Sequence, residues 1–397
     1  MKAFDRVPRD LLWSILERFG VPAKLINILR SLHNNINVKF TVDEITHVLT
    51  CRIGVKQGDI LGPILFTFFI AAVMISWRTS FVRPLCMFRS KEDFKLTGRR
   101  PNAKGSKFPL EDSEYADDTA VLFESRQDLE RFSPLLIDHF NRFGMEVHTG
   151  DENHPEKPPK TEVLFVAAPK WSYTNPSSYD NQNLDHVTLN DGKFLPVVDK
   201  FCYLGTTLSR DCSDNDDVSL RIQKAGNAFG SLRRCIFSQH RVSVSVKRTV
   251  YEGLILPILL YGAETWCLTK TIFDLVVRMF HHRCIRAMSG VTMKDVFERR
   301  LSTDDLLQHL NLRRIDTYIT KRQLSWAGHV ARMGFDRLPR KMLSCWVPEK
   351  RSIGAPEFTY GRGLFKSIKK AGLDKENWHV VAADRVAWRN VIDNVLL

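Results

Sequence analysis

Two adjacent aspartates, Asp117 and Asp118, constrain the fold of this chain more than any other feature. The apolar run 120–123 that follows them is typical of a buried strand, and the Asp, Ala and Thr residues at its start are typical of a hairpin tip. Neighbouring carboxylates beside a buried strand repel each other unless a cation neutralises them. Mg²⁺ is commonly bound by few carboxylates together with substrate phosphates. The sequence therefore predicts a metal-binding hairpin tip within 114–123, and a solvated Asp-Asp turn is the alternative.

The charge balance of the chain indicates a polyanionic partner. Lys and Arg number 58 against 45 Asp and Glu, which gives a formal net charge of +13 over 397 residues. A nucleic-acid-binding protein needs such an excess to neutralise phosphates, although a basic protein that binds no polyanion is also compatible with it. Hydrophobic residues make up 44% of the chain and charged residues 26%, so two or three folded domains are expected.

The cysteines and the N-terminus favour an intracellular protein. Eight cysteines are scattered along the chain, and none forms a Cys-x-x-Cys pair. This spacing predicts reduced thiols rather than a disulfide framework, and it offers no zinc ribbon or knuckle. Residues 1–6 carry charges and no apolar core, so no signal peptide is expected there.

One segment, 60–77, is uncharged and long enough for a membrane span. Gly62 and Pro63 lie near its start, however, and the polar stretch 56–59 precedes it. We therefore expect a helix that is buried in a large core, and no membrane partner.

Hydrophobic patterns place further helices and strands in the first half of the chain. Apolar residues at helical spacing predict helices over 8–19 and 127–143. Two β-rich runs, 38–42 and 45–53, predict a hairpin. The alternation of apolar and charged residues at 2–5 predicts the edge of a strand.

A glycine-rich loop, 54–58, precedes the predicted buried helix. Glycine allows the backbone to approach a ligand closely, and the N-terminus of a helix favours phosphate. The loop is therefore a candidate contact for a nucleotide, with the Gln57 amide as a hydrogen-bonding group for a base or a sugar. An ordinary loop before a core helix is the alternative.

Three basic features could contact phosphates. The polar segment 78–107 carries nine Lys or Arg and is expected to be an exposed insertion that either touches nucleic acid or is only solvated. Lys160 precedes a predicted strand at 163–167 and could reach a triphosphate or form a surface salt bridge. The region 221–300 is predicted to be helical and has fourteen basic against five acidic residues, as expected of helices that lie along a phosphate backbone.

Five short blocks occur in order along the chain. They are Lys-Ala-Phe-Asp at 2–5, Gly-x-x-Gln-Gly at 54–58, Tyr-Ala-Asp-Asp at 115–118, Gly144 followed by Lys-Thr at 160–161, and Tyr-Leu-Gly at 203–205. With this set the chain resembles the reverse transcriptase of non-LTR (LINE-type) retrotransposons over nearly its whole length. The aspartate block alone is a moderate signal, whereas five blocks in this order are specific.

The resemblance implies an α+β right-hand polymerase fold. It implies a palm with an antiparallel sheet and packed helices over 1–210, a basic helical thumb over 211–300 and a helical C-terminal region over 301–397. The implied activity is RNA-directed DNA synthesis through two Mg²⁺ ions, with deoxynucleoside triphosphates added to the 3′-OH of a DNA primer on an RNA template. The family's work implies a nuclear location.

The resemblance also implies roles for the matching residues. Asp117 and Asp118 are the implied catalytic carboxylates and metal ligands, and Tyr115 lies at the primer end. Phe4 matches the residue that rejects a 2′-hydroxyl. The other implied contacts to nucleotide and template are Gln57, Gly58 and Lys160, and the residues that match the primer grip are Tyr203, Leu204 and Gly205.

One departure from the family pattern concerns the first block. The family's block reads Asp-x-x-Lys-Ala-Phe-Asp, and its opening aspartate, the third catalytic carboxylate, would lie two positions before Met1. Asp5 is not expected to replace it, and the fingers and an endonuclease are also expected to be missing. Because loss of one member of a catalytic set removes most of its activity, we expect a fragment without polymerase activity. The alternatives are a nucleic-acid-binding relic and a decayed gene model.

Overall fold

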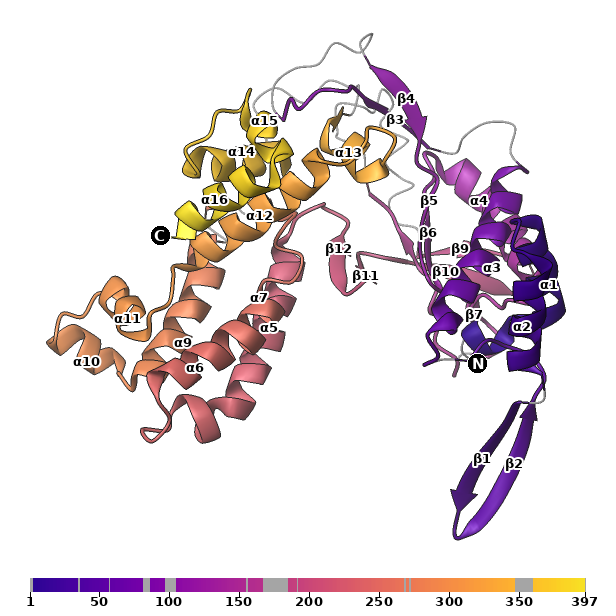
Figure 1. The fold of residues 1–397 in the computed structure, drawn as a ribbon, viewed down its shortest axis with the longest axis horizontal. Coiled ribbons are helices and arrows are strands. Elements are labelled where there is room, and N and C mark those ends of the chain that lie inside the picture. Colours follow the sequence, from indigo (N-terminus) through magenta and orange to yellow (C-terminus); the bar gives the residue numbers. More distant parts are fainter. Residues whose placement is uncertain are drawn as a thin grey trace. The chain divides into compact units, whose positions relative to one another are not determined.

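The residues of the chain divide into two compact units (Figure 1). Unit 1 comprises 1–87, 109–163 and 183–198, and unit 2 comprises 88–108, 164–182 and 199–397. Helices and small antiparallel sheets occur together, so the chain is a mixed α/β protein, in agreement with the predicted α+β class. The computed structural model describes residues 3–34, 36–56, 58–80, 86–96, 105–154, 156–166, 185–190, 192–267, 269–270, 273–346 and 360–396.

Four helices build the core of unit 1. Pro8 directly precedes the first of them, and Ser125 caps the last by accepting a hydrogen bond from the backbone N–H of Asp128 (3.0 Å). The helices predicted over 8–19 and 127–143 are therefore confirmed. The four helices are α1 (Arg9–Arg18), α2 (Ala23–His33), α3 (Leu61–Arg78) and α4 (Arg126–Arg142).

Helix α3 is the central element of this core. Its buried side chains include Phe66, Phe69, Val73 and Trp77, which belong to one apolar cluster with residues of α1, α2 and α4. Among the described residues, α3 is the one helix long and apolar enough to cross a membrane. Core helices of soluble proteins have the same length and composition, and the packing of its buried face agrees with the predicted core helix over 60–77.

The prediction of a strand edge at 2–5 is wrong, because residues Ala3–Arg6 form a short 3₁₀ helix, η1. The Phe4 carbonyl accepts a hydrogen bond from the N–H of Val55 (2.8 Å), and the Val7 carbonyl accepts one from the N–H of Gly54 (2.9 Å). The N-terminal segment therefore pairs with the glycine-rich loop instead of with a neighbouring strand.

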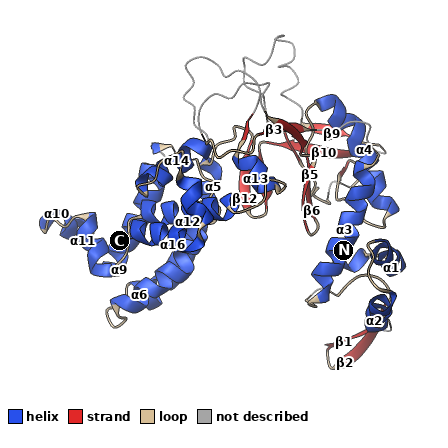
Figure 2. Cartoon of the chain, turned by 45° about the horizontal axis from the view of Figure 1, so that its top comes forward, coloured by secondary structure: helices blue, strands red, loops and turns tan. Residues whose placement is uncertain are grey.

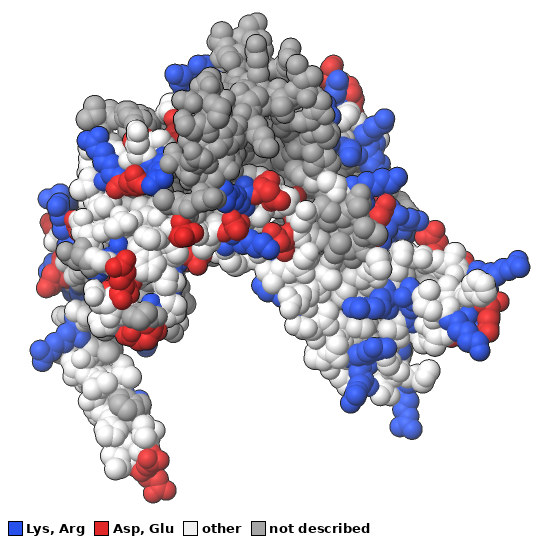
Figure 3. Space-filling view, turned by 180° about the vertical axis from the view of Figure 1, so that it is seen from behind, with Lys and Arg blue, Asp and Glu red and all other residues white. Residues whose placement is uncertain are grey.

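The predicted hairpin at 38–53 is confirmed as strands β1 (Ile36–Val42) and β2 (Ile45–Cys51). The two-residue loop, Asp43-Glu44, has positive φ at both positions, as the turns of tight hairpins require. The hairpin extends away from the four helices of unit 1 (Figure 1), and the space-filling view shows few charges along its body and acidic side chains at its tip (Figure 3).

Two further sheets complete unit 1. One contains β10 (Lys193–Val198), which pairs antiparallel with β7 (Gly150–Asp151) and β9 (His186–Thr188) and also neighbours β8 (Val163–Leu164). The other is a two-stranded hairpin of β5 (Asp112–Tyr115) and β6 (Asp118–Val121), drawn in red in Figure 2. The second hairpin contains the aspartate pair.

Unit 2 is mainly helical. Its strands are β13 (Cys345–Trp346), β3 (Met87–Ser90) and β4 (Ser106–Pro109) in one sheet, and β11 (Lys200–Tyr203) and β12 (Thr206–Ser209) in a hairpin. The helices are α5 (Asn215–Leu232), η4 (Arg233–Phe237), α6 (Val244–Val250), η5 (Tyr251–Ile255), α7 (Leu256–Leu259), η6 (Phe273–Arg278), α9 (Met279–Ser289), α10 (Met293–Glu298), α11 (Thr303–Leu310), α12 (Ile315–Ala331), α13 (Leu338–Leu343), α14 (Tyr360–Lys370), α15 (Trp378–Ala383) and α16 (Arg385–Leu396).

The helices of unit 2 share two apolar cores. The larger one runs from Val218 in α5 to Ile319 in α12, so helices on both sides of residue 300 contribute to it. The smaller one is centred on Trp378 and Trp388 and contains residues of α12, α14, α15 and α16. On the face drawn in Figure 3, basic side chains are scattered among acidic ones over the helical surface.

A buried polar pair, Tyr251 and His281, lies inside the larger core. The His281 Nε2 faces the carbonyl oxygen of Arg313 at 3.2 Å, so this nitrogen carries the ring proton, and Nδ1 accepts from the Tyr251 hydroxyl at 2.8 Å. Burial lowers the pKa of His281 from 6.5 to about 4. The imidazole is therefore neutral at physiological pH, and both of its nitrogens are satisfied.

Candidate active site

The aspartate pair lies at the tip of the β5–β6 hairpin. Tyr115 pairs with Asp118, so the loop consists of Ala116 and Asp117 alone. Ala116 has φ of +54°, a left-handed conformation that costs a residue with a Cβ roughly 1–2 kcal/mol. Strained backbone of this kind is found most often at functional sites. The turn is therefore tight and locally strained where the two carboxylates leave it.

Both carboxylates are open to solvent, and the Tyr115 side chain beside them is 66% exposed. Within the described part of the chain, neither the Asp117 nor the Asp118 carboxylate has a hydrogen-bond or ion-pair partner. The residues that the structure describes include no cluster of three or more His, Cys, Asp or Glu side chains that could hold a metal ion. The pair therefore offers two oxygen-donor groups, and a divalent ion bound there would take its remaining ligands from substrate phosphates or water.

Arg78, at the end of α3, anchors the hairpin below its tip. Its Nε donates to Asp112 Oδ2 at 2.8 Å, and its guanidinium reaches Glu114 Oε1 at 2.7 Å. These two acids lie two residues apart in β5 and so point to the same side of the strand. The hydrogen bond to Asp112 raises the pKa of Arg78, while burial followed by the charge of Asp112 raises the pKa of Glu114. The strands are thus held to the helical core while the tip stays open.

The glycine-rich loop is fixed against the N-terminal segment. Gly54 has φ of +84°, and a Cβ at this position would lie 2.7 Å from the backbone of Asp5. Glycine is therefore required here for space as well as for conformation. The close approach brings the loop to Phe4, whose ring stacks on Phe66 with centroids 4.3 Å apart and planes 10° apart. The first two sequence blocks are thus joined, and the Phe4 ring is held in one orientation.

Arg9 of α1 locks the same loop. Its guanidinium donates to the carbonyl oxygens of Gly54 (2.8 Å), Cys51 (2.9 Å), Ile53 (3.2 Å) and His33 (2.6 Å). One side chain therefore fixes the end of α2, the end of β2 and the start of the loop. Burial lowers the pKa of Arg9, yet an arginine keeps its charge across the physiological pH range.

The structure describes two of the three other residues predicted to contact the nucleotide, Gly58 and Lys160. Gln57 lies outside the described residues. Gly58 has φ of +91°, and nothing lies within 4 Å of the position that a Cβ would take. Lys160 is exposed, and its backbone N–H donates to the carbonyl of His148 (3.2 Å). Its ammonium group has no partner within the described part of the chain, so it is available to an anionic ligand.

The Tyr203, Leu204 and Gly205 block lies in unit 2, at the turn of the β11–β12 hairpin. Tyr203 ends β11, and Leu204 and Gly205 form the two-residue loop. Residues 200–209 therefore form a hairpin. The structure thus groups Tyr115, Asp117 and Asp118 at one turn, and Tyr203, Leu204 and Gly205 at another.

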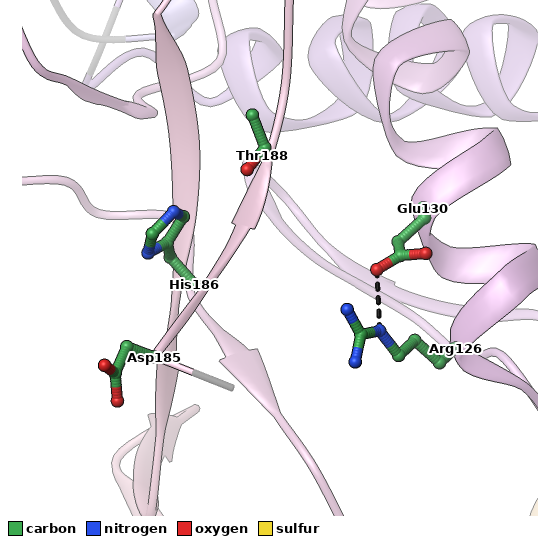
Figure 4. Close-up of a pocket in the computed structure, with 5 residues that line it drawn as sticks. All are labelled: Arg126, Glu130, Asp185, His186 and Thr188. Carbon is green, nitrogen blue, oxygen red and sulfur yellow. Dashed lines mark hydrogen bonds and ion pairs between the residues drawn. The ribbon is translucent and has the colours of Figure 1, made fainter. Parts of the chain in front are cut away.

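A cavity of about 310 Å³ lies beside α4 and β9 in unit 1 (Figure 4). In the close-up, Arg126 and Glu130 form an ion pair (2.6 Å) on the helix, while Asp185, His186 and Thr188 belong to the β9 segment. None of the residues that line this cavity is a predicted site residue. The cavity therefore does not mark the candidate active site.

Sequence reasoning missed the side chains that hold these turns. Arg9 and Arg78 bind residues 45 and 34 positions away in the chain, and Arg221 and Tyr261 do the same for the 204–205 turn. No periodicity or motif marks such long-range partners. The only available signal is that Arg9 and Arg78 are basic residues next to predicted apolar helices.

Comparison with known proteins supports the resemblance found in the sequence. Residues 1–150 match the family model described as reverse transcriptase (RNA-dependent DNA polymerase). A transposon-derived protein of Caenorhabditis elegans is 27% identical over 285 residues, which is 70% of this chain and 93% of that protein.

Two Drosophila melanogaster proteins also match. The RNA-directed DNA polymerase from mobile element jockey is 22% identical over 73% of this chain and 27% of its own length. A protein named "probable RNA-directed DNA polymerase from transposon BS" is 23% identical over 72% of this chain and 28% of its own length. The chain therefore spans about a quarter of these two relatives.

These matches agree with the ordered blocks, of which three lie within the matched family segment. Residues 1–150 thus match the reverse transcriptase family model, and the chain is similar to RNA-directed DNA polymerases of transposable elements, in agreement with the resemblance to reverse transcriptases of non-LTR retrotransposons.

Proposed function

We propose that this chain is the RNA-directed DNA polymerase region of a non-LTR retrotransposon. In this proposal it adds deoxynucleotides to the 3′-OH of a primer on an RNA template, with unit 1 as the palm and the helices of unit 2 as thumb and C-terminal region. The observation that carries the proposal is the strained β5–β6 turn, which exposes Asp117 and Asp118 without protein partners. Exposed adjacent carboxylates fit divalent ions whose other ligands come from a nucleotide.

Each site residue has a defined task in this proposal. Divalent ions, two Mg²⁺, would be held by Asp117 and Asp118 and would supply activation of the primer hydroxyl and stabilisation of the leaving phosphate. Phe4, fixed by its stacking on Phe66, would occupy the space of a ribose 2′-hydroxyl. Lys160 would approach the triphosphate, with Gln57 and Gly58 on the nucleotide and the template.

Cation binding tests the proposed metal ligands without relying on activity. Tb³⁺ occupies Mg²⁺ sites and becomes luminescent when a nearby tyrosine transfers excitation energy to it. Tyr115 lies next to the carboxylates and can serve as the donor. We expect a Tb³⁺ signal that excess Mg²⁺ removes, that Asp117→Asn with Asp118→Asn abolishes, and that Tyr115→Phe dims without changing the competing Mg²⁺ concentration.

Primer extension tests the activity itself. An RNA template with a DNA primer, deoxynucleotides and Mg²⁺ would be given to the 397-residue chain and to its Asp117→Ala variant. Extension that Asp117→Ala abolishes would support the proposed polymerase activity. Binding without extension by either protein would overturn that activity and favour the alternative of a nucleic-acid-binding relic. Absence of both nucleic-acid binding and a Tb³⁺ signal would overturn the proposed function.

A further inference from the structure

The β11–β12 turn has an unusual distribution of hydrogen bonds. Leu204 and Gly205 have φ of +50° and +80°, the two positive values of a tight hairpin turn. The carbonyl oxygens of both loop residues accept hydrogen bonds from side chains of the helical region. Among the described residues no acceptor pairs with the N–H groups of these two residues. The acceptors of the turn are thus occupied, whereas its donors are open to an anionic ligand.

Two side chains take the two carbonyl oxygens. The Tyr261 hydroxyl donates to the Leu204 carbonyl at 2.8 Å, and the Arg221 guanidinium donates to the Gly205 carbonyl. The Arg221 guanidinium carbon also lies 4.3 Å from the centroid of the Tyr261 ring, within cation–π distance. Arg221 is 5% exposed and Tyr261 is 47% exposed. The two side chains therefore support each other as well as the turn.

Asp217 is the third side chain that supports the turn. Its Oδ1 accepts from the Thr207 backbone N–H at 3.0 Å and faces Arg221 Nε at 3.5 Å, and its Oδ2 accepts from Trp266 Nε1 at 3.1 Å. Gly262 has φ of +79°, and a Cβ there would make only ordinary contacts with Thr206 Oγ1 (3.4 Å) and Asp217 Oδ2 (3.8 Å), so its backbone conformation favours glycine. The buried carboxylate therefore joins the hairpin strand, the arginine and the Trp266 side chain.

Stability alone is a weak reason for this arrangement. A buried ion pair usually contributes little net stability, because the cost of removing both charges from water offsets their attraction. A two-residue hairpin turn with glycine also forms without charged support. What the network adds is a single conformation of the turn, with its carbonyl oxygens turned to protein and its N–H groups left unpaired.

We propose that Asp217, Arg221 and Tyr261 are positioning residues that hold the 203–205 turn in the conformation that receives the phosphate backbone at the primer end. The inference rests on the proposed function, because it needs the turn to contact a primer. The three residues do not touch the reacting atoms. They act by fixing the Leu204 and Gly205 backbone and by keeping carbonyl oxygens away from the phosphate.

The test uses Tyr261→Phe in the 397-residue chain, because this change removes one oxygen from a half-exposed side chain and keeps the ring over Arg221. Fluorescence anisotropy would measure binding to a DNA primer recessed on an RNA template and to a blunt duplex of the same length. We expect about tenfold weaker binding of the recessed primer end, the size of one lost hydrogen bond, and unchanged binding of the blunt duplex. Hydrogen exchange of the peptide that contains Leu204 and Gly205 should become faster.

Tyr318→Phe is the matched control. Its hydroxyl also forms hydrogen bonds inside unit 2, donating to Glu252 Oε1 at 2.7 Å and accepting from the Arg313 backbone N–H at 3.3 Å, and neither bond involves the hairpin. Arg221→Lys is the second variant: it keeps the charge and loses the planar fork, and it should weaken binding of the recessed end in the same way.

The possible results distinguish a failure of this inference from a failure of the proposed function. A lower melting temperature of Tyr261→Phe or Arg221→Lys with an unchanged ratio of recessed-end to blunt-end affinity would show a purely structural role and overturn the inference. An equal loss in Tyr318→Phe would overturn it as well. A wild-type chain that binds recessed and blunt ends equally would overturn the proposed primer contact itself, and the inference with it.

Discussion

The β5–β6 hairpin of unit 1 and the β11–β12 hairpin of unit 2 have the same size but are held in opposite ways. Each joins two four-residue strands through two residues, and the first loop residue has positive φ although it is not glycine. In the first hairpin the strands are anchored by Arg78, and within the described part of the chain the carboxylates of Asp117 and Asp118 have no protein partners. In the second, side chains hold the tip itself by its carbonyl oxygens.

Under the proposed function, the two hairpins differ because they would bind a ligand through different groups. A turn that binds through its own carboxylates must leave them free, so it can only be anchored from below. A turn that binds through its backbone needs one conformation of that backbone, so its tip must be held. The comparison therefore predicts that aspartates at the two hairpins respond very differently to substitution.

The largest difference is expected between Asp217 and the exposed pair. Asp217→Ala leaves the buried Arg221 without its counter-charge and should lower the free energy of unfolding of unit 2 by about 3–5 kcal/mol. Asp117→Ala and Asp118→Ala should change the stability of unit 1 by less than about 0.5 kcal/mol. Urea unfolding followed by hydrogen exchange of peptides from each unit measures both.

A control for this prediction is the neighbouring residue Asp216, which forms an exposed ion pair with Lys200 (2.7 Å). Asp216→Ala should cost no more than about 1 kcal/mol. Similar losses at Asp216, Asp217 and Asp117 would remove the distinction between the two hairpins.

The stability of the two units should respond differently to a fall in pH. The folded-state pKa of His281 is lowered to about 4, so unfolded unit 2 binds this proton first as the pH falls below 6.5, and on the order of 3 kcal/mol of stability is lost between pH 6.5 and 4. The pKa of Glu114 is raised, so its contribution to unit 1 is greatest at low pH and is lost as the pH rises through the raised value.

Hydrogen exchange of both units at several pH values between 7 and 4 tests this prediction. The His281→Gln variant should lose most of the acid sensitivity that unit 2 shows in this range, since its amide does not titrate. An unchanged pH profile in the variant would exclude His281 as the cause.

Replacement of Arg78, which anchors the β5–β6 hairpin, should lower the stability of unit 1 by an intermediate amount. Arg78→Met leaves the Asp112 side chain, which is 5% exposed, without its bidentate partner, and we expect a loss of about 1–3 kcal/mol in unit 1. Arg126→Met is a suitable control, because its ion pair with Glu130 lies on the surface of α4. Stability measured by urea unfolding should be nearly unchanged in the control; an equal loss in both variants would contradict the anchoring role.

The smallest effect is expected from relief of strain at the first turn. Ala116→Gly places a residue that tolerates positive φ in the loop and should raise the stability of unit 1 by up to about 1 kcal/mol. Tb³⁺ luminescence would then show whether the relaxed turn still holds the cation. A stability loss would mean that the positive φ of Ala116 carries no strain.

Local sequence signals predicted the elements well and the contacts between them poorly. Periodicity and turn residues indicated the helices at 8–19 and 127–143, the hairpin at 38–53 and the aspartate turn. At 2–5 the same reasoning failed, since the alternation arises from a 3₁₀ helix bound to a loop, not from a strand.

The supports of the candidate site could not be predicted in this way. Arg221 lies in α5, which follows the hairpin, whereas Tyr261 comes just after α7 and 57 residues from Leu204. Nothing in the immediate neighbours of either residue marks it as a support of the 204–205 turn. The ordered blocks identified the turns that carry the candidate site residues, whereas the side chains that shape those turns became visible only in the folded chain.

Trp266 connects the second hairpin to a remote part of the sequence. Its carbonyl oxygen accepts from Gln323 Nε2 at 3.2 Å, and Gln323 Oε1 accepts from the Ser367 hydroxyl at 2.6 Å. A premature stop codon between codons 324 and 367 would keep Gln323 but remove Ser367, so Gln323 Oε1 would lose its hydrogen-bond donor next to Trp266, which binds Asp217. A copy of the gene could thus keep all five sequence blocks and still encode a hairpin with altered geometry, so an intact motif set is not a sufficient criterion for an intact gene.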